Sequence, residues 1–169
     1  MRKFLDGAIV VGAVGFIAIL AISAVFDHTI IWLHVFQALM YLAVIGLIVG
    51  RNRLAYFLGF SIAAFWNYAN LFVTSFFANG LAALKTLIAT GRMTRPDQLI
   101  AVAAVAFHFL MILGCLILMI QTSRKAGADL LRLLVVFVLA TAYFAAIMAL
   151  FQPRYLSLFG RLLHPHGLF

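Results

Sequence analysis

Residues 54–91 read LAYFLGFSIAAFWNYANLFVTSFFANGLAALKTLIATG, an apolar stretch whose only charged residue is Lys85. As a single α-helix it would extend about 57 Å at about 1.5 Å per residue, nearly twice the roughly 30 Å hydrocarbon core of a membrane. The stretch must therefore bend, or cross a membrane twice. The number of membrane-spanning helices in the protein depends on which it does.

The rest of the chain is equally apolar. Of its 169 residues, 67% are hydrophobic and 9% are charged, whereas soluble domains are roughly 45–50% apolar and about a quarter charged. A soluble fold of this size could not bury so much apolar surface in one core. The apolar residues also form runs long enough to span a membrane, for which about 18 residues suffice. The sequence predicts an all-α polytopic transmembrane helical bundle, formed as a single domain over residues 1–169.

A turn signal at Asn79-Gly80 divides the long stretch into a full span and a shorter remainder. Leu81, Leu84 and Leu87 share one face of this remainder, which is typical of an interfacial helix or half of a re-entrant loop. We therefore predict spans at residues 7–26, 30–50, 54–78, 98–120 and 130–151, an interfacial or re-entrant segment at 81–90, and an amphipathic tail at 152–169. If residues 54–91 cross twice instead, the total becomes six spans.

The twelve Lys and Arg residues lie singly or in pairs between the apolar runs, without a continuous basic face. Their placement predicts contact with lipid headgroups and no nucleic-acid partner. With the N-terminus inside, five spans place seven of the twelve inside and five outside, a weak positive-inside bias that six spans would improve. We expect an integral protein of a bacterial-type inner (plasma) membrane.

Several kinds of chemistry lack the residues they need. The acidic residues Asp6, Asp27, Asp97 and Asp129 all fall at predicted span ends, which argues against a carrier driven by a buried carboxylate. Catalytic and phosphate-binding motifs are absent from the sequence. The single cysteine, Cys115, excludes an intrachain disulfide and a Cys-rich metal cluster. The sequence favours a protein without catalytic activity, resident metal or cofactor.

Uncharged polar residues are predicted to form a layer at similar depth, about 12–15 Å from one end of the spans at the helical rise. Such groups must find partners inside the bundle, either as hydrogen bonds between helices or around a ligand cavity. The candidate ligand-binding residues are His34, Gln37, Asn67, Asn70, His108 and Tyr143. Haem ligation by His34 and His108 is the weakest of these interpretations, because their levels differ by about 7 Å.

Small residues indicate close helix packing, at Gly12 and Gly15 in the first span and at Gly46-x-x-x-Gly50 in the second. Together with the missing motifs, they favour a non-catalytic integral membrane subunit of a homo- or hetero-oligomeric membrane complex. Its partners would be the lipid bilayer and other membrane subunits or further copies of itself. The alternatives are a small channel, carrier or lipid-binding protein with a polar intramembrane cavity, and a haem- or quinone-binding redox subunit.

Overall fold

The computed structural model describes residues 1–93, 95–123 and 125–162, apart from the side chain of residue 158. All regular secondary structure in these residues is helical. The longer helices are α1 (Arg2–Phe26), α2 (Ile31–Val49), α3 (Leu54–Tyr68), α4 (Phe76–Thr90), α5 (Pro96–Thr122) and α6 (Ala126–Phe151). The shorter ones are η1 (His28–Ile30), η2 (Ala69–Val73), η3 (Pro153–Leu156) and α7 (Ser157–Arg161).

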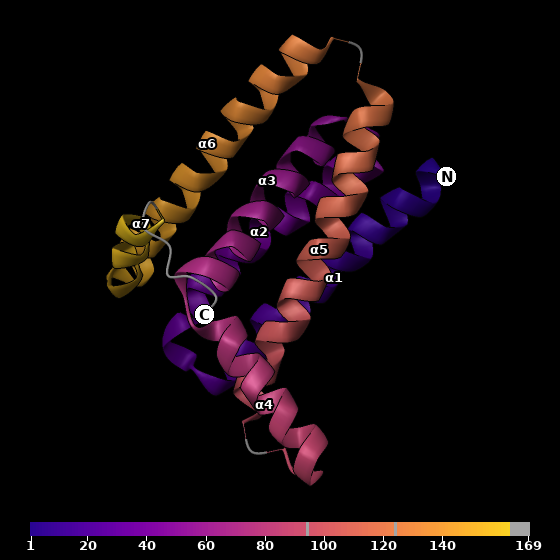
Figure 1. The fold of residues 1–169 in the computed structure, drawn as a ribbon. Coiled ribbons are helices and arrows are strands. Elements are labelled where there is room, and N and C mark those ends of the chain that lie inside the picture. Colours follow the sequence, from indigo (N-terminus) through magenta and orange to yellow (C-terminus); the bar gives the residue numbers. More distant parts are fainter. Residues whose placement is uncertain (94, 124, 163–169) are drawn as a thin grey trace.

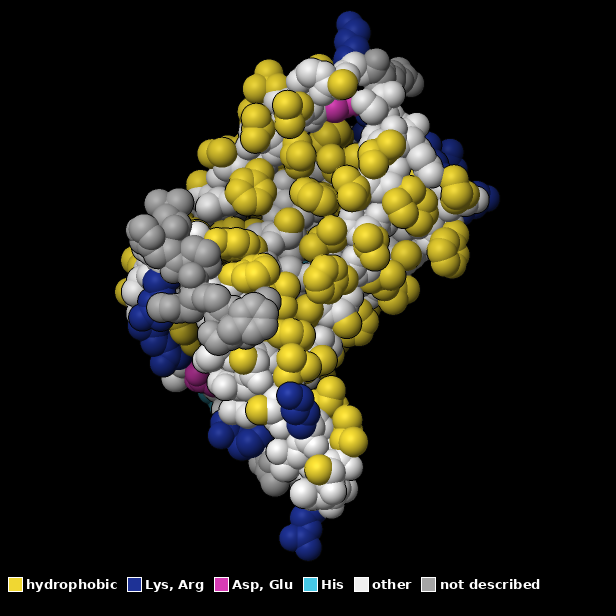
Figure 2. Space-filling view, viewed as in Figure 1, with side chains coloured by type: hydrophobic (Ala, Val, Ile, Leu, Met, Phe, Trp, Pro, Cys, Tyr) yellow, Lys and Arg dark blue, Asp and Glu magenta, His cyan; other side chains and the backbone are white. Residues whose placement is uncertain are grey.

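Among the described residues, four helices are long and apolar enough to cross a membrane: Arg2–Phe26, His28–Val49, Pro96–Thr122 and Ala126–Phe151. A fifth candidate is the pair Leu54–Val73 and Phe76–Thr90, which is bent by 72° (Figure 1). The structure therefore confirms an all-helical chain with four to five candidate spans. Figure 2 shows hydrophobic side chains over the middle of the visible face, with most Lys and Arg side chains toward its two ends.

The long apolar stretch bends earlier than predicted. Asn79 and Gly80 lie inside α4, and the helix instead breaks at Thr74, whose backbone is extended (φ −110°, ψ 166°). The close packing of α4 on α5 requires glycine at position 80, because a Cβ there would lie 2.8 Å from the Gln98 carbonyl oxygen. The turn predicted at Asn79-Gly80 is therefore wrong, because this glycine serves a helix contact.

The predicted tail is helical in its described part, η3 and α7; residues 163–169 lie outside the described residues. Side-chain hydrogen bonds hold this part to the rest of the bundle. Arg154 pairs with Asp27 at 3.3 Å, and the Gln152 amide donates to the Thr29 carbonyl. The Tyr68 hydroxyl donates to the Leu162 carbonyl at 2.8 Å. These bonds place η3 beside the α1–α2 connection, which we call the Asp27 end of the bundle.

Polar contacts also gather at the other end, which we call the Arg2 end. There the Tyr56 hydroxyl donates to Asp6 at 3.0 Å and so connects α3 with α1. Arg53 pairs with Asp129 at 3.2 Å, connecting the start of α3 with α6. Helices α1, α2, α3, α5 and α6 run alternately between the two ends, so the N-terminus and η3 lie at opposite ends (Figure 1).

The packing of α1 against α5 depends on glycine, as predicted for Gly12 and Gly15. A Cβ at Gly12 would lie 2.8 Å from the Phe107 carbonyl oxygen, and one at Gly15 would overlap the Phe107 ring. At Gly46 of the second predicted pair, nothing within the described chain lies within 4 Å of an added Cβ. Gly12 and Gly15 thus determine how closely two long helices approach.

We expect Gly12→Ala to destabilise the protein by about 1–3 kcal/mol, because the Phe107 backbone cannot move away from an added methyl group without shifting α5. Gly7→Ala in the same helix is the matched control, since no atom lies within 4 Å of its Cβ. It should be neutral or stabilise by up to about 1 kcal/mol through helix propensity. Thermal unfolding in mild detergent measures both, and equal effects of the two substitutions would contradict the proposed packing.

Candidate functional site

The polar layer predicted from the sequence separates into two groups. In the first group, side chains bond across helices. The His108 ring Nε2 lies 2.7 Å from the Tyr41 hydroxyl, and the Tyr143 hydroxyl donates to the Phe36 carbonyl at 2.7 Å. The Asn67 amide donates to the Val105 carbonyl at 3.4 Å. These three candidates connect α5 with α2, α6 with α2, and α3 with α5, and none of them lines the cavity that the second group forms.

His108 lies in the middle of the bundle and is fully buried. The Phe16 ring of α1 packs on it with centroids 4.0 Å apart, and Phe16 also contacts Tyr41 at 4.7 Å. The other histidine of the haem hypothesis, His34, directs its Nδ1 to the Leu20 carbonyl at 2.9 Å. The two rings therefore occupy separate environments and do not face each other across a shared space.

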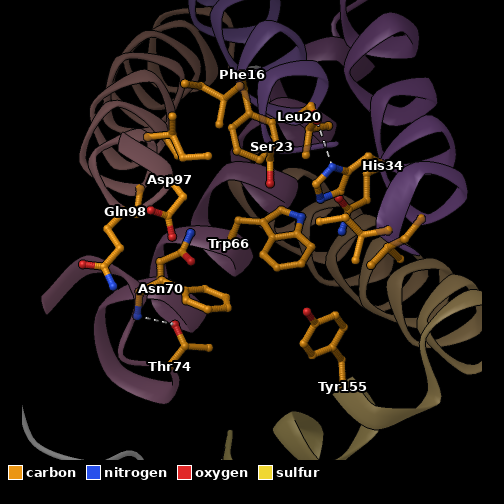
Figure 3. A pocket seen from close by; sticks show the side chains of 18 of the residues that line it. Phe16, Leu20, Ser23, His34, Trp66, Asn70, Thr74, Asp97, Gln98 and Tyr155 are labelled. Carbon is orange, nitrogen blue, oxygen red and sulfur yellow. Dashed lines mark hydrogen bonds between the residues drawn. The ribbon is translucent and has the colours of Figure 1, made fainter. Parts of the chain in front are cut away.

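The second group lines a cavity of about 420 Å³ at the Asp27 end of the bundle (Figure 3). Three of the predicted residues, His34, Gln37 and Asn70, contribute to its wall. Apolar side chains form much of the rest, with Phe16 and Leu20 from α1 and Trp66 from α3. The other polar residues of the wall are Ser23, Thr74, Asn79, Arg95, Asp97, Gln98 and Tyr155.

The bend after η2 shapes this cavity. Residues Ala69–Val73 form a π-helix, a distortion that is frequent at functional sites. Asn70 and Thr74 from this region line the cavity, and Figure 3 shows both side chains at one side of the open space. Beyond the bend, α4 leaves the bundle direction by 72° and packs through Gly80 on the start of α5. Because of the bend, α4 forms an additional wall of the cavity.

The inner end of the cavity holds polar groups without protein partners. Gln37 is 3% exposed and lines the cavity, and its amide makes no hydrogen bond with any described residue. The Trp66 indole Nε1 is buried and also has no partner among the described residues. In Figure 3 the indole nitrogen points toward His34. A buried polar atom without a partner costs about 1–3 kcal/mol, and Ser61 Oγ, Asn67 Oδ1, His108 Nδ1 and Thr141 Oγ1, outside the cavity lining, are in the same position as the Trp66 Nε1.

The chemistry of His34 follows from its one hydrogen bond. A carbonyl oxygen can only accept, so Nδ1 of His34 carries the proton that it donates to Leu20. In the neutral ring the other nitrogen, Nε2, is then an acceptor. Figure 3 shows this second nitrogen directed toward the cavity. The inner end therefore offers an imidazole acceptor and an amide that can both donate and accept.

The only charged side chains among the described lining residues form a pair. Arg95 donates from Nε and from its terminal nitrogen to the two carboxylate oxygens of Asp97, at 3.2 and 3.0 Å. Such a two-pronged contact satisfies both charges locally. The Arg95 side chain is 58% exposed, which places the pair at the rim and leaves the interior of the cavity uncharged.

Sequence reasoning thus found part of the cavity and missed the rest. His34 and Gln37 are three residues apart on one helix face, and Asn70 and Thr74 are four apart, so spacing identified both patches. Trp66 precedes Asn70 by four residues and shares its face, a signal that could have added it. Ser23, Asn79, Gln98 and Tyr155 carry no such signal, because the tertiary contacts of α1, α4, α5 and η3 bring them together.

We expect Tyr41→Phe to destabilise the protein by about 1–3 kcal/mol, because it leaves the buried His108 Nε2 without a partner. Tyr68→Phe removes an exposed hydroxyl from its bond to Leu162 and should change stability by less than about 0.5 kcal/mol. Chemical or thermal unfolding in mild detergent compares the two. A Tyr41 variant as stable as the Tyr68 variant would show that the buried bond contributes little.

The contact between η3 and the α1–α2 connection should depend on pH. The Thr29 hydroxyl and backbone N–H, which bond Asp27 at 2.6 and 2.9 Å, lower the pKa of Asp27, and Arg154 adds to the effect. An unfolded Asp has a pKa of about 3.9. The stabilisation that ionised Asp27 gives the folded protein is therefore complete above about pH 4. It is lost as the pH falls through the lower pKa that Asp27 has in the folded state.

We expect Asp27→Asn to lower the apparent melting temperature at pH 6, because the charged contact with Arg154 is lost. The difference from the wild type should shrink as the pH falls below about 4, where the wild-type carboxylate becomes protonated. Melting curves from pH 3 to pH 7 measure this difference. A difference that stays constant over the whole range would mean that the Asp27 charge does not stabilise the fold.

Comparison with known proteins returns no relative: no family model, no curated protein and no solved structure matches this chain. Its function is therefore inferred from the cavity and the residues that line it.

Proposed function

We propose that this is a non-catalytic integral membrane protein that binds a small amphipathic molecule or lipid in the cavity at the Asp27 end. The observation that carries the proposal is Gln37, an amide that is 97% buried yet unpaired among the described residues, facing a space of about 420 Å³. Ligand pockets commonly have volumes of about 300–1,000 Å³, with mostly apolar walls and a few polar groups. This cavity has that size and that composition.

The contrast with the other polar side chains supports binding over packing. Asn67, His108 and Tyr143 each make one hydrogen bond to a neighbouring helix, although the second polar atoms of two of them, Asn67 Oδ1 and His108 Nδ1, have no partner among the described residues. If Gln37 served only to hold helices together, it would be expected to have such a partner as well. A molecule bound in the cavity would satisfy it.

The position of the cavity favours binding over conduction. Its wall reaches Gln37 on α2 and Ala104 on α5. Beyond that level the bundle is filled by fully buried side chains, including Tyr41, His108 and Met111. An open path through the protein would require these residues to move apart, whereas a binding pocket requires only the space that is present.

Assembly with other subunits stays a prediction from the sequence, as does location in a bacterial-type inner membrane. The haem alternative is less well supported than the pocket. Of its two proposed ligands, His34 lines the cavity, whereas the Nε2 of His108 is bonded to Tyr41 outside it. Binding of a quinone remains compatible with the same cavity, and it is a special case of an amphipathic ligand.

We expect Ser23→Phe to block binding, because Ser23 points into the cavity and a phenyl ring there would occupy space that the ligand needs (Figure 3). Ala21→Phe is the matched control, since it adds the same ring to an exposed position of the same helix. Native mass spectrometry of protein purified in mild detergent should show one retained small-molecule or lipid adduct per chain in the wild type and in Ala21→Phe. It should show none in Ser23→Phe.

Two results of this experiment would contradict the proposal. One is that the wild type carries no adduct and acquires none when total membrane lipid is added back. The other is that Ser23→Phe retains the same adduct as the wild type while keeping its helical circular dichroism, which would place the bound molecule on the outer surface of the bundle.

A further inference from the structure

We propose that the ligand of this cavity is an uncharged amphiphile that carries a hydroxyl group, and that the hydroxyl bonds to Gln37 and His34. The inference rests on the proposed function and adds the chemical class and orientation of the bound molecule. It is carried by the unpaired donors and acceptors at the inner end of the cavity and by the absence of unneutralised charge among its described lining residues.

The donors and acceptors at the inner end match a hydroxyl group. The Gln37 amide N–H groups can only donate, so the ligand must supply an acceptor for them. The His34 Nε2 accepts in the neutral ring, so the ligand must also supply a donor. A hydroxyl does both through a single oxygen atom: it can donate to His34 Nε2 and accept a hydrogen bond from the Gln37 amide. An ether or a ketone accepts only, and would leave His34 Nε2 unpaired.

Charged headgroups fit this end poorly. The nearest formal charges in the described lining, Arg95 and Asp97, already satisfy each other at the rim. A carboxylate or an ammonium group beside Gln37 would be removed from water without an opposite charge, which is far more costly than burying a hydroxyl. The interior therefore selects against fatty acids and alkyl amines of the same length.

The remaining wall suits an apolar body. The apolar part of the lining includes Ile19, Leu20, Leu33, Phe76 and Ile100. The Tyr155 ring from η3 faces the cavity from another side (Figure 3). An alkyl or ring portion would contact these side chains, so the molecule lies with its hydroxyl inward and its apolar part toward the rim.

Trp66 can report on this binding directly. The chain contains two tryptophans, and Trp32 is 64% exposed and lies outside the cavity lining. In a Trp32→Phe background, the emission of Trp66 should shift when a ligand contacts its ring in the cavity wall. The probes are decan-1-ol, 1-methoxydecane, decanoate and decylammonium, which share a chain length and differ in the headgroup.

We expect a saturable shift with decan-1-ol and about tenfold weaker binding of 1-methoxydecane, the size expected from losing one buried hydrogen bond. Decanoate and decylammonium should bind more weakly still. Gln37→Met keeps the length of the side chain without its amide, and should weaken decan-1-ol about tenfold. Gln121→Leu, at an exposed position near the other end of α5, is the control and should leave the affinity unchanged.

The outcomes separate the two proposals. If decan-1-ol and 1-methoxydecane bind equally and Gln37→Met has no effect, the cavity binds amphiphiles but the hydroxyl assignment is wrong. If decanoate or decylammonium binds most tightly, the assignment of an uncharged ligand is wrong, although the cavity still binds amphiphiles. If no probe gives a saturable response that Ser23→Phe removes, the proposed function fails as well. Native mass spectrometry of Gln37→Met with decan-1-ol supplies a second measurement, in which weakened binding is expected and unchanged binding would overturn the hydroxyl assignment.

Discussion

The hydrogen bond between Tyr41 and His108 lies at the centre of this bundle, and the position of the cavity depends on it. It joins α2 to α5 at 2.7 Å between two side chains that are both fully buried. Phe16 of α1 packs against both rings, so three helices meet at one point. In apolar surroundings each of these polar groups would be costly alone, and paired they hold the helices in one register. Because this cluster fills the interior, the space at the Asp27 end is closed at its inner side and forms a pocket.

Glycine packing complements that central bond. Gly12 and Gly15 let α1 lie directly on the backbone and ring of Phe107, and Gly80 lets α4 lie on the first turns of α5. Contacts through small residues allow helices to approach closely without large side chains between them. The first of these contacts holds the closed part of the bundle together, and the second holds the bent helix against it. Between them, the bend at Thr74 leaves room that side chains do not fill.

The two groups of polar residues show how similar side chains can have different structural roles. Asn67 and Gln37 are both amides, and both are at least 96% buried. Asn67 donates to the Val105 carbonyl of the adjacent α5, whereas Gln37 faces open space beside the Trp66 indole. Two residues of the same chemical class therefore differ in surroundings, one bonded to a helix backbone and the other lining the cavity. A pocket in a helical bundle can thus arise where an expected interhelical bond is missing.

The sequence alone determined that the chain is all-helical with long apolar helices, and it gave the approximate bounds of those helices. It also determined the glycine face of α1 and the set of polar residues inside the bundle. These follow from local composition and from the helical period, which place residues on the face of a single helix. Tertiary structure decided which neighbouring helix or cavity each helix face contacts. Gly80 became a packing contact and Thr74 the bend, although Asn79-Gly80 carried the stronger turn signal. His34, Gln37 and Asn70 came to share a cavity while Asn67, His108 and Tyr143 found partners, because helix rotation and neighbouring backbone are set by long-range packing that no local pattern encodes.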